Sequence, residues 1–159
     1  MISLFSLPAL AQDVPQFEVF GGYSLLNLGG TGKDYGQGFI GAVEGNVTGW
    51  FGIVGEFGFY DFEMGSSYYY MGGPRFSYRT DHVRTFGHFL FGGINAKDDN
   101  GSISDTEFGW GFGGGIDIAV NDIIAIRPAQ FDVISVHTNT GFHVDGRYSG
   151  GVVFTFGSK

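Results

Sequence analysis

The sequence contains no cysteine, four prolines and only eight lysines and arginines in 159 residues. Without cysteine, the chain can form no disulfide framework, thiol nucleophile or thiolate metal site. The formal net charge is −8 at pH 7 and no basic stripe is present, which argues against nucleic acid as a partner. No segment approaches about 18 uninterrupted apolar residues, so we predict no transmembrane helix.

Glycine and aromatic residues dominate the composition instead. The chain has 30 Gly, 18 Phe, 8 Tyr and 2 Trp, and only 15% of its residues are charged. A soluble domain of this size normally carries about 25% charged residues. Here glycine lies inside the apolar segments, a composition that disfavours helices and favours strands. It is typical of tilted strands in a closed barrel, with aromatic side chains facing lipid.

The N-terminal segment resembles the end of a secretory signal. Residues 1–11 are apolar and end in Ala9-Leu10-Ala11, a pattern of small residues typical of signal-peptide cleavage. The segment is too short to span a bilayer as a helix and lacks a basic beginning. We therefore expect a signal-peptide remnant over 1–11 and one β-barrel domain over 12–159, with a disordered apolar tail as the alternative.

Alternation with period two is the main structural signal. In 106–119, for example, Phe108, Trp110 and Phe112 share one face and Glu107 lies on the other. The same pattern predicts eight strands: 17–26, 37–47, 51–61, 68–79, 84–96, 106–119, 124–134 and 142–156. Pro74 suggests a bulge or bend in the fourth strand, and Pro128 makes the register of the seventh uncertain.

The predicted connections alternate in length. The short ones lie around Thr48, Asp81 and Asn121, and the longer ones around Gly30, Gly65, Gly101 and Thr138. Short turns at one end and longer loops at the other are the pattern of outer-membrane barrels, and both termini then fall at the short-turn end. Strands of this length can cross a bilayer when tilted.

Alternation alone does not say which face is inside, because a soluble barrel or sandwich also alternates. The sizes of the side chains decide the matter. Large aromatic residues crowd one face and small or charged residues the other, and the interior of an eight-stranded barrel is narrow. We therefore predict an all-β, eight-stranded antiparallel up-and-down transmembrane β-barrel with its aromatic face on the lipid.

Several segments also resemble a known family. They are VFGGYS at 19–24, GPRFSYR at 73–79, FGG at 91–93, GGGID at 113–117 and GVVFTF at 151–156. Over 16–157 the sequence resembles the outer-membrane β-barrel domain proteins, akin to the transmembrane domain of OmpA. The last segment resembles the aromatic-ended strand that barrel-assembly machinery recognises in this family, although Gly157-Ser158-Lys159 follow its final aromatic residue.

The resemblance implies a location in the bacterial outer membrane and a structural or surface-interaction role. Expected partners are outer-membrane lipid, including lipopolysaccharide, and the barrel-assembly machinery during biogenesis; we expect a monomer. One alternative is a pore for small solutes or ions. Another is a lipid-modifying enzyme built around His137, but Asn139 stands where such enzymes carry serine, so we expect a solvated loop histidine and no catalytic residues.

The inward face of the predicted barrel carries charged residues of both signs. They are Glu18, Glu44, Glu56, Arg75, Glu107, Asp117, Arg127 and Arg147. An unpaired charge in a narrow interior is costly, so we expect a paired network, with a conducting or gated path as the alternative. In particular, Arg75 and Arg127 should pair with Glu44, Glu56 or Asp117. The histidines lack ligand spacing, so neither a metal site nor a cofactor is expected.

Overall fold

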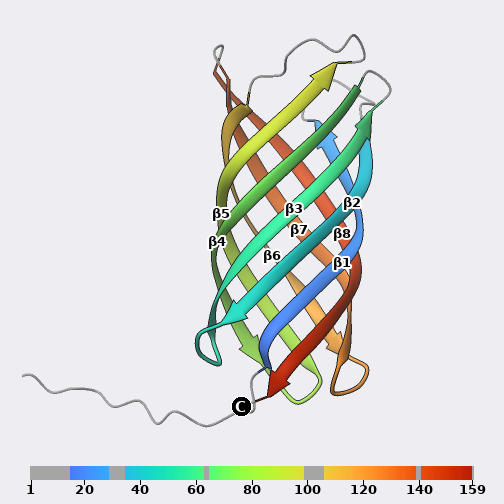
Figure 1. The fold of residues 1–159 in the computed structure, drawn as a ribbon, viewed down its shortest axis with the longest axis vertical. Coiled ribbons are helices and arrows are strands. Elements are labelled where there is room, and N and C mark those ends of the chain that lie inside the picture. The colour runs from blue at the N-terminus through green and yellow to red at the C-terminus, as the bar shows by residue number, and fades with distance from the viewer. Residues whose placement is uncertain (1–14, 29–34, 63–64, 99–105, 139–140, 159) are drawn as a thin grey trace, which may run out of the picture.

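The computed structural model describes residues 15–28, 35–62, 65–98, 106–138 and 141–158. The elements are β1 (Pro15–Leu28), β2 (Tyr35–Asn46), β3 (Phe51–Phe62), β4 (Gly65–Arg79), β5 (Val83–Asp98), β6 (Thr106–Ala119), β7 (Ile124–Thr138) and β8 (Gly141–Ser158). Each strand pairs antiparallel with its sequence neighbours, and β8 returns to β1, which closes the barrel (Figure 1). The predicted eight-stranded up-and-down barrel is confirmed. The described residues include no helix suited to crossing a membrane.

The first residues of β1 and the last residues of β8 lie at the same end of the barrel as the three short turns, at the bottom of Figure 1. Pro15 is opposite Ser158 at this end of the barrel. Side chains close the turns: Thr48 Oγ1 accepts a hydrogen bond from the Phe51 amide at 3.0 Å, and Asn121 Oδ1 accepts one from the Ile124 amide at 2.7 Å. Such local side-chain bonds replace ladder bonds where the chain reverses.

Two of the four predicted longer loops are shorter than expected. Because β4 begins at Gly65 and β7 continues to Thr138, only residues 63–64 and 139–140 separate these strands from their neighbours. The apolar alternation used for the prediction fades in these polar extensions, but ladder pairing does not depend on side-chain polarity. The strands therefore continue past the point at which the sequence signal stops.

Pro74 and Pro128, the two prolines for which an irregularity was predicted, have different effects on strand register. At Pro74 the predicted bulge is absent: Pro74 lies opposite Ile53 on β3 without a register shift, and β5 keeps one register on either side of it. At Pro128 the register against β8 shifts between Arg127 and Gln130. Because proline donates no amide hydrogen bond, a bulge here removes it from the ladder. The bulge also changes which residues of β7 face inward.

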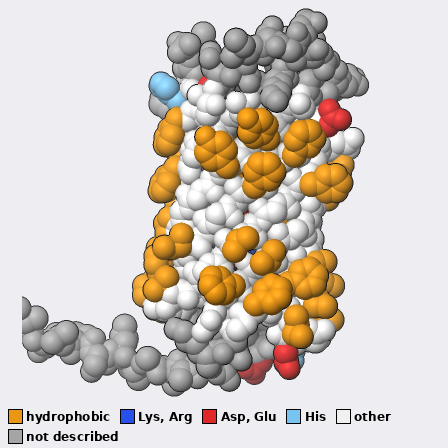
Figure 2. Space-filling view, in the orientation of Figure 1, with side chains coloured by type: hydrophobic (Ala, Val, Ile, Leu, Met, Phe, Trp, Pro, Cys, Tyr) orange, Lys and Arg blue, Asp and Glu red, His pale blue; other side chains and the backbone are white. Residues whose placement is uncertain are grey.

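The outer surface carries the large hydrophobic side chains. Phe39, Phe57 and Phe108 are 71%, 56% and 60% exposed. On the face shown in Figure 2, hydrophobic side chains gather in two bands, with few between them. Bands of aromatic residues at the two interfaces are characteristic of transmembrane barrels. The predicted assignment of the outward face therefore holds.

The lumen differs from the expectation that only small and charged residues fit inside. Phe20, Tyr60, Tyr69 and Phe86 are buried there. The rings occupy space left by inward-facing glycines. A Cβ atom at Gly115 would lie 2.7 Å from the Phe86 ring, one at Gly22 would lie 2.8 Å from the Phe20 ring, and one at Gly58 would collide with Tyr69. Glycine is thus inside as predicted, but it makes room for rings as well as for charges.

Candidate functional site: a charge network in the lumen

The lumen contains a connected network of ionic side chains. Its positive members are all five arginines of the sequence: Arg75, Arg79, Arg84, Arg127 and Arg147. The carboxylates that pair with them are Glu18, Glu44, Glu56, Asp117 and Asp132. Equal numbers of the two signs suit a buried site, because an uncompensated charge there costs several kcal/mol, about 3–5 kcal/mol when one partner is removed.

The part nearest the short turns is organised by Arg84. Glu18 and Glu44 lie directly opposite each other on β1 and β2, where two like charges repel. Arg84 on β5 reaches both, at 2.8 Å from Glu18 and 2.6 Å from Glu44. Arg79 adds a second ion pair to Glu18 at 2.8 Å. The two carboxylates are therefore held together by shared arginines.

Arg127 is fixed by both charge and aromatic contacts. Its Nε and Nη2 donate to the two oxygens of Asp117 at 2.6 Å and 3.0 Å, and its Nη1 donates to Gln130 at 2.8 Å. The guanidinium also lies 4.2 Å from the centre of the Phe20 ring and 4.4 Å from that of Phe86. A planar guanidinium combines a bidentate carboxylate bond with ring stacking in a way that lysine does not.

Arg147 is the corresponding centre further from the short turns. One of its nitrogens lies 2.5 Å from Glu56 and 2.6 Å from Asp132, and another donates to the Tyr69 hydroxyl. Tyr69 in turn donates to Glu56 at 3.0 Å. The Arg147 side chain is fully buried, so these groups replace all of its contacts with water.

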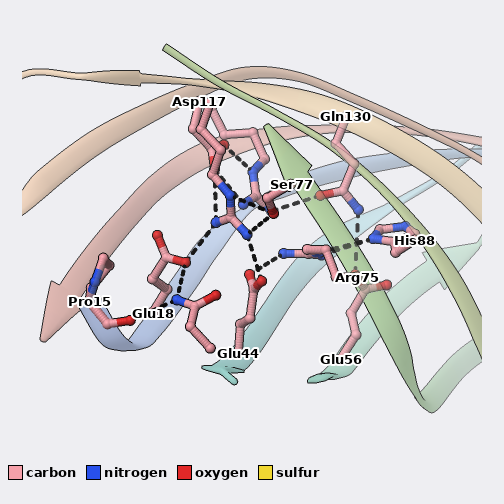
Figure 3. Close-up of polar contacts among 12 residues, drawn as sticks. Pro15, Glu18, Glu44, Glu56, Arg75, Ser77, His88, Asp117 and Gln130 are labelled. Carbon is pink, nitrogen blue, oxygen red and sulfur yellow. Dashed lines mark hydrogen bonds and ion pairs between the residues drawn. The ribbon is translucent and has the colours of Figure 1, made fainter. Parts of the chain in front are cut away.

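His88 joins the two parts of the network. Arg75 donates to Glu44 at 3.0 Å and to His88 Nδ1 at 2.9 Å, and Figure 3 shows it between these two residues. Since Nδ1 accepts from a guanidinium, the ring proton lies on Nε2, which contacts Asp132 at 2.5 Å. A continuous chain of polar contacts therefore runs from Glu18 to Arg147.

The network includes seven of the eight charged residues predicted to face inward. Glu18, Glu44, Glu56, Arg75, Asp117, Arg127 and Arg147 come together, and the expected pairs Arg75–Glu44 and Arg127–Asp117 are present. Glu107 is the exception. It is half-buried toward the loop end of β6, and it forms no ion pair among the described residues.

Sequence reasoning missed Asp132 because of the bulge at Pro128. Strict alternation from the inward-facing Arg127 would place Asp132 on the lipid side, but the bulge shifts the phase so that Gln130 and Asp132 both face inward. Pro128 was the available signal, since proline inside a ladder marks edges and bulges. Arg84 was also missed, although it shares its face with His88.

The lumen differs at its two ends. At the short-turn end, a cavity of about 740 Å³ is lined by Arg79, Arg84 and Asp117 together with residues of the turns. Toward the loop end, the buried interior is mainly apolar, with Tyr60, Met71 and Ile134, and Asp145 is also buried there opposite Ile134. The cavity that opens at the short-turn end therefore reaches the ion pairs. A mainly apolar layer lies between these ion pairs and the loop end of the barrel.

Other sequence predictions concern the ends and loops of the chain. His137 is exposed near the end of β7, two residues from the buried Ser135. Asn139 and residues 1–11 lie outside the described residues. No group of three His, Asp or Glu suited to holding a metal occurs within the described ranges.

An apolar exterior around a charged lumen in a closed antiparallel barrel defines a transmembrane β-barrel. The family described as outer membrane protein beta-barrel domain matches residues 1–156, so the chain belongs to that family and to the bacterial outer membrane. No curated protein sequence is significantly similar to the chain.

Solved structures of outer-membrane proteins share this fold. Neisserial surface protein A is 16% identical, with a TM-score of 0.75 over 89% of this chain and 97% of that one. Ail, the attachment invasion locus protein of Yersinia pestis, is 15% identical, with a TM-score of 0.60 over 89% and 99%. The N-terminal β-barrel domain of Pseudomonas aeruginosa OprF is 11% identical, with a TM-score of 0.59 over 87% and 98%. At these identities the likeness concerns the fold alone.

Proposed function

We propose that the protein is a structural, surface-interacting barrel of the outer membrane whose lumen does not conduct ions. The observation that carries the proposal is the packing of the lumen. Arg75, Arg127 and Arg147 are each 1% exposed or less and lie between carboxylates and rings that come from several strands. The interior of an eight-stranded barrel is just wide enough for side chains to fill it.

The same contacts argue against a gate that opens easily. Arg84 contacts Glu18, Glu44 and Ser77, and Arg147 contacts Glu56 and Asp132, so moving either guanidinium breaks several charge-assisted bonds at once. Each such bond is roughly twice as strong as a neutral one. The apolar layer beyond them adds a second barrier to ions.

In this proposal the protein acts through its outer surface and not through its lumen. Neisserial surface protein A and Ail, the attachment invasion locus protein, carry surface roles in their names on the same fold. We propose by analogy that this barrel acts through its loops and its contacts with envelope lipid, lipopolysaccharide included, without a catalytic site. Assembly by the barrel-assembly machinery through β8, followed by function as a monomer, belongs to the same proposal.

Planar-bilayer recording tests the closed lumen. Purified protein refolded into lipid should give no discrete current steps, because ions would have to cross the ion pairs and the apolar layer. An Arg75→Ala/Arg84→Ala double variant, which removes two side chains that cross the lumen, is the comparison that shows whether the network is the obstacle; it should admit ions more readily. Frequent, resolved steps from the unaltered protein would contradict the proposal and favour the pore alternative.

A further inference from the structure

A groove lies on the outer side of the barrel between β4 and β5, close to the short turns. It has a volume of about 360 Å³ and is lined chiefly by Trp50, Phe76, Tyr78, Thr85 and Gly87. It is continuous with the exposed apolar surface, since Trp50, Phe76 and Tyr78 are all at least half exposed. The groove is therefore separate from the charged lumen described above.

One wall of the groove is a stack of rings. Trp50 lies over Phe76 with their centroids 6.1 Å apart and their planes 16° apart, and Phe51 packs against both rings. The backbone also holds this wall in place, because the Ser77 amide donates to the Trp50 carbonyl at 2.9 Å. Rings packed in this way lose little further freedom when a ligand lies against them.

The floor of the groove lacks a side chain. Gly87 lies opposite Phe76 on one side and opposite Gly114 on the other, so two glycines sit together on the outer face. A Cβ atom at Gly87 would meet only the Gly113 carbonyl oxygen, at an ordinary 3.6 Å. Packing of the barrel therefore does not require glycine at this position, although the shape of the groove does.

The end of the groove nearest the turn is polar. Tyr78 and Thr85 lie opposite each other there, and their side chains add two hydroxyl groups to a groove that is otherwise lined by aromatic residues and glycine. Short turns of outer-membrane barrels face the periplasm, and aromatic residues with a polar atom favour the depth of lipid headgroups. The groove is thus apolar toward the bilayer centre and polar toward the periplasmic interface.

We propose that this groove binds one glycerophospholipid of the periplasmic leaflet. An acyl chain lies over Gly87 against the Trp50–Phe76 wall, and the polar glycerol region lies toward Tyr78 and Thr85. The continuity of the groove with the lipid-facing surface identifies lipid as the occupant, and the short-turn location selects the leaflet. The proposal does not depend on whether the lumen conducts.

Native mass spectrometry of the protein extracted from phosphatidylethanolamine–phosphatidylglycerol vesicles tests the site. The unaltered barrel should keep one phospholipid after mild delipidation. Gly87→Leu, which fills the groove, should lower the bound fraction at least tenfold. Gly21→Leu is the matched control, because a Cβ at this glycine on β1 meets nothing within 4 Å and the position lies outside the groove. Its bound fraction should not change.

Fluorescence gives a second readout in the bilayer itself. In a Trp110→Phe variant, Trp50 is the one remaining tryptophan. Chain-brominated phospholipid should quench its fluorescence at a lower mole fraction of brominated lipid in this variant than in the Trp110→Phe/Gly87→Leu variant. If Gly87→Leu fails to fold, Trp50→Ala removes the wall and should release the lipid in the mass-spectrometric assay. Equal phospholipid retention by the unaltered barrel and the groove variants would overturn the proposal.

Discussion

Replacing Arg147 with methionine is expected to lower the free energy of unfolding by about 3–5 kcal/mol, among the largest effects available in this barrel. The substitution keeps much of the side-chain volume but leaves Glu56 and Asp132, which lie 2.5 Å and 2.6 Å from the guanidinium, as uncompensated charges in the lumen. Urea unfolding in detergent micelles, followed by tryptophan fluorescence, measures the change.

Neutralising the two carboxylates provides the matched control. The triple variant Arg147→Met/Glu56→Gln/Asp132→Asn should recover most of the lost stability, because it removes the charges as well as their partner. The Asp81→Asn variant, altered in an exposed turn, should change the free energy of unfolding by less than about 0.5 kcal/mol. An Arg147→Met barrel as stable as the parent would show that these charges are not buried together.

A lysine placed on the lipid-facing surface should have an effect that depends on its depth. Phe57 lies near the middle of β3 and is 56% exposed on the outer face, so Phe57→Lys should cost about 2–4 kcal/mol in a bilayer. Asp61 is exposed near the loop end of the same strand, and Asp61→Lys should cost about 0–1 kcal/mol. Reversible folding into lipid vesicles measures both. Equal costs at the two positions would contradict the membrane depth assigned to β3.

Most of the barrel follows from two features of the sequence. Side chains of a strand alternate between two faces, and the large rings on the face of Trp110, opposite the glycines and Glu107, mark the outward face of β6 without any knowledge of its neighbours. Turn residues such as Thr48 and Asn121 then mark where the chain reverses. Together these local signals predict the number of strands, their order and the lipid-facing side.

Features that depend on pairing between strands were less predictable. Asp132 faces inward only because the bulge at Pro128 shifts the phase of β7, and a single sequence does not show whether proline bends, bulges or interrupts a ladder. Pro74, which keeps its register, is the opposite case. Likewise, Tyr69 fits inside because Gly58 lies beside it on β3, a match set by register between two strands.

Arginine provides a direct probe of the lumen, because every arginine of the sequence belongs to the network. The central claim is that these guanidiniums are ion-paired and that the ion pairs beyond the short-turn cavity close the lumen. Hydrogen exchange of the Nε–H groups in arginine-labelled protein, measured by NMR in lipid nanodiscs, tests it. Protected signals from Arg75, Arg127 and Arg147, the three fully buried guanidiniums, after transfer to D₂O are the predicted result. Loss of all these signals within the dead time would show a lumen open to water and contradict the account.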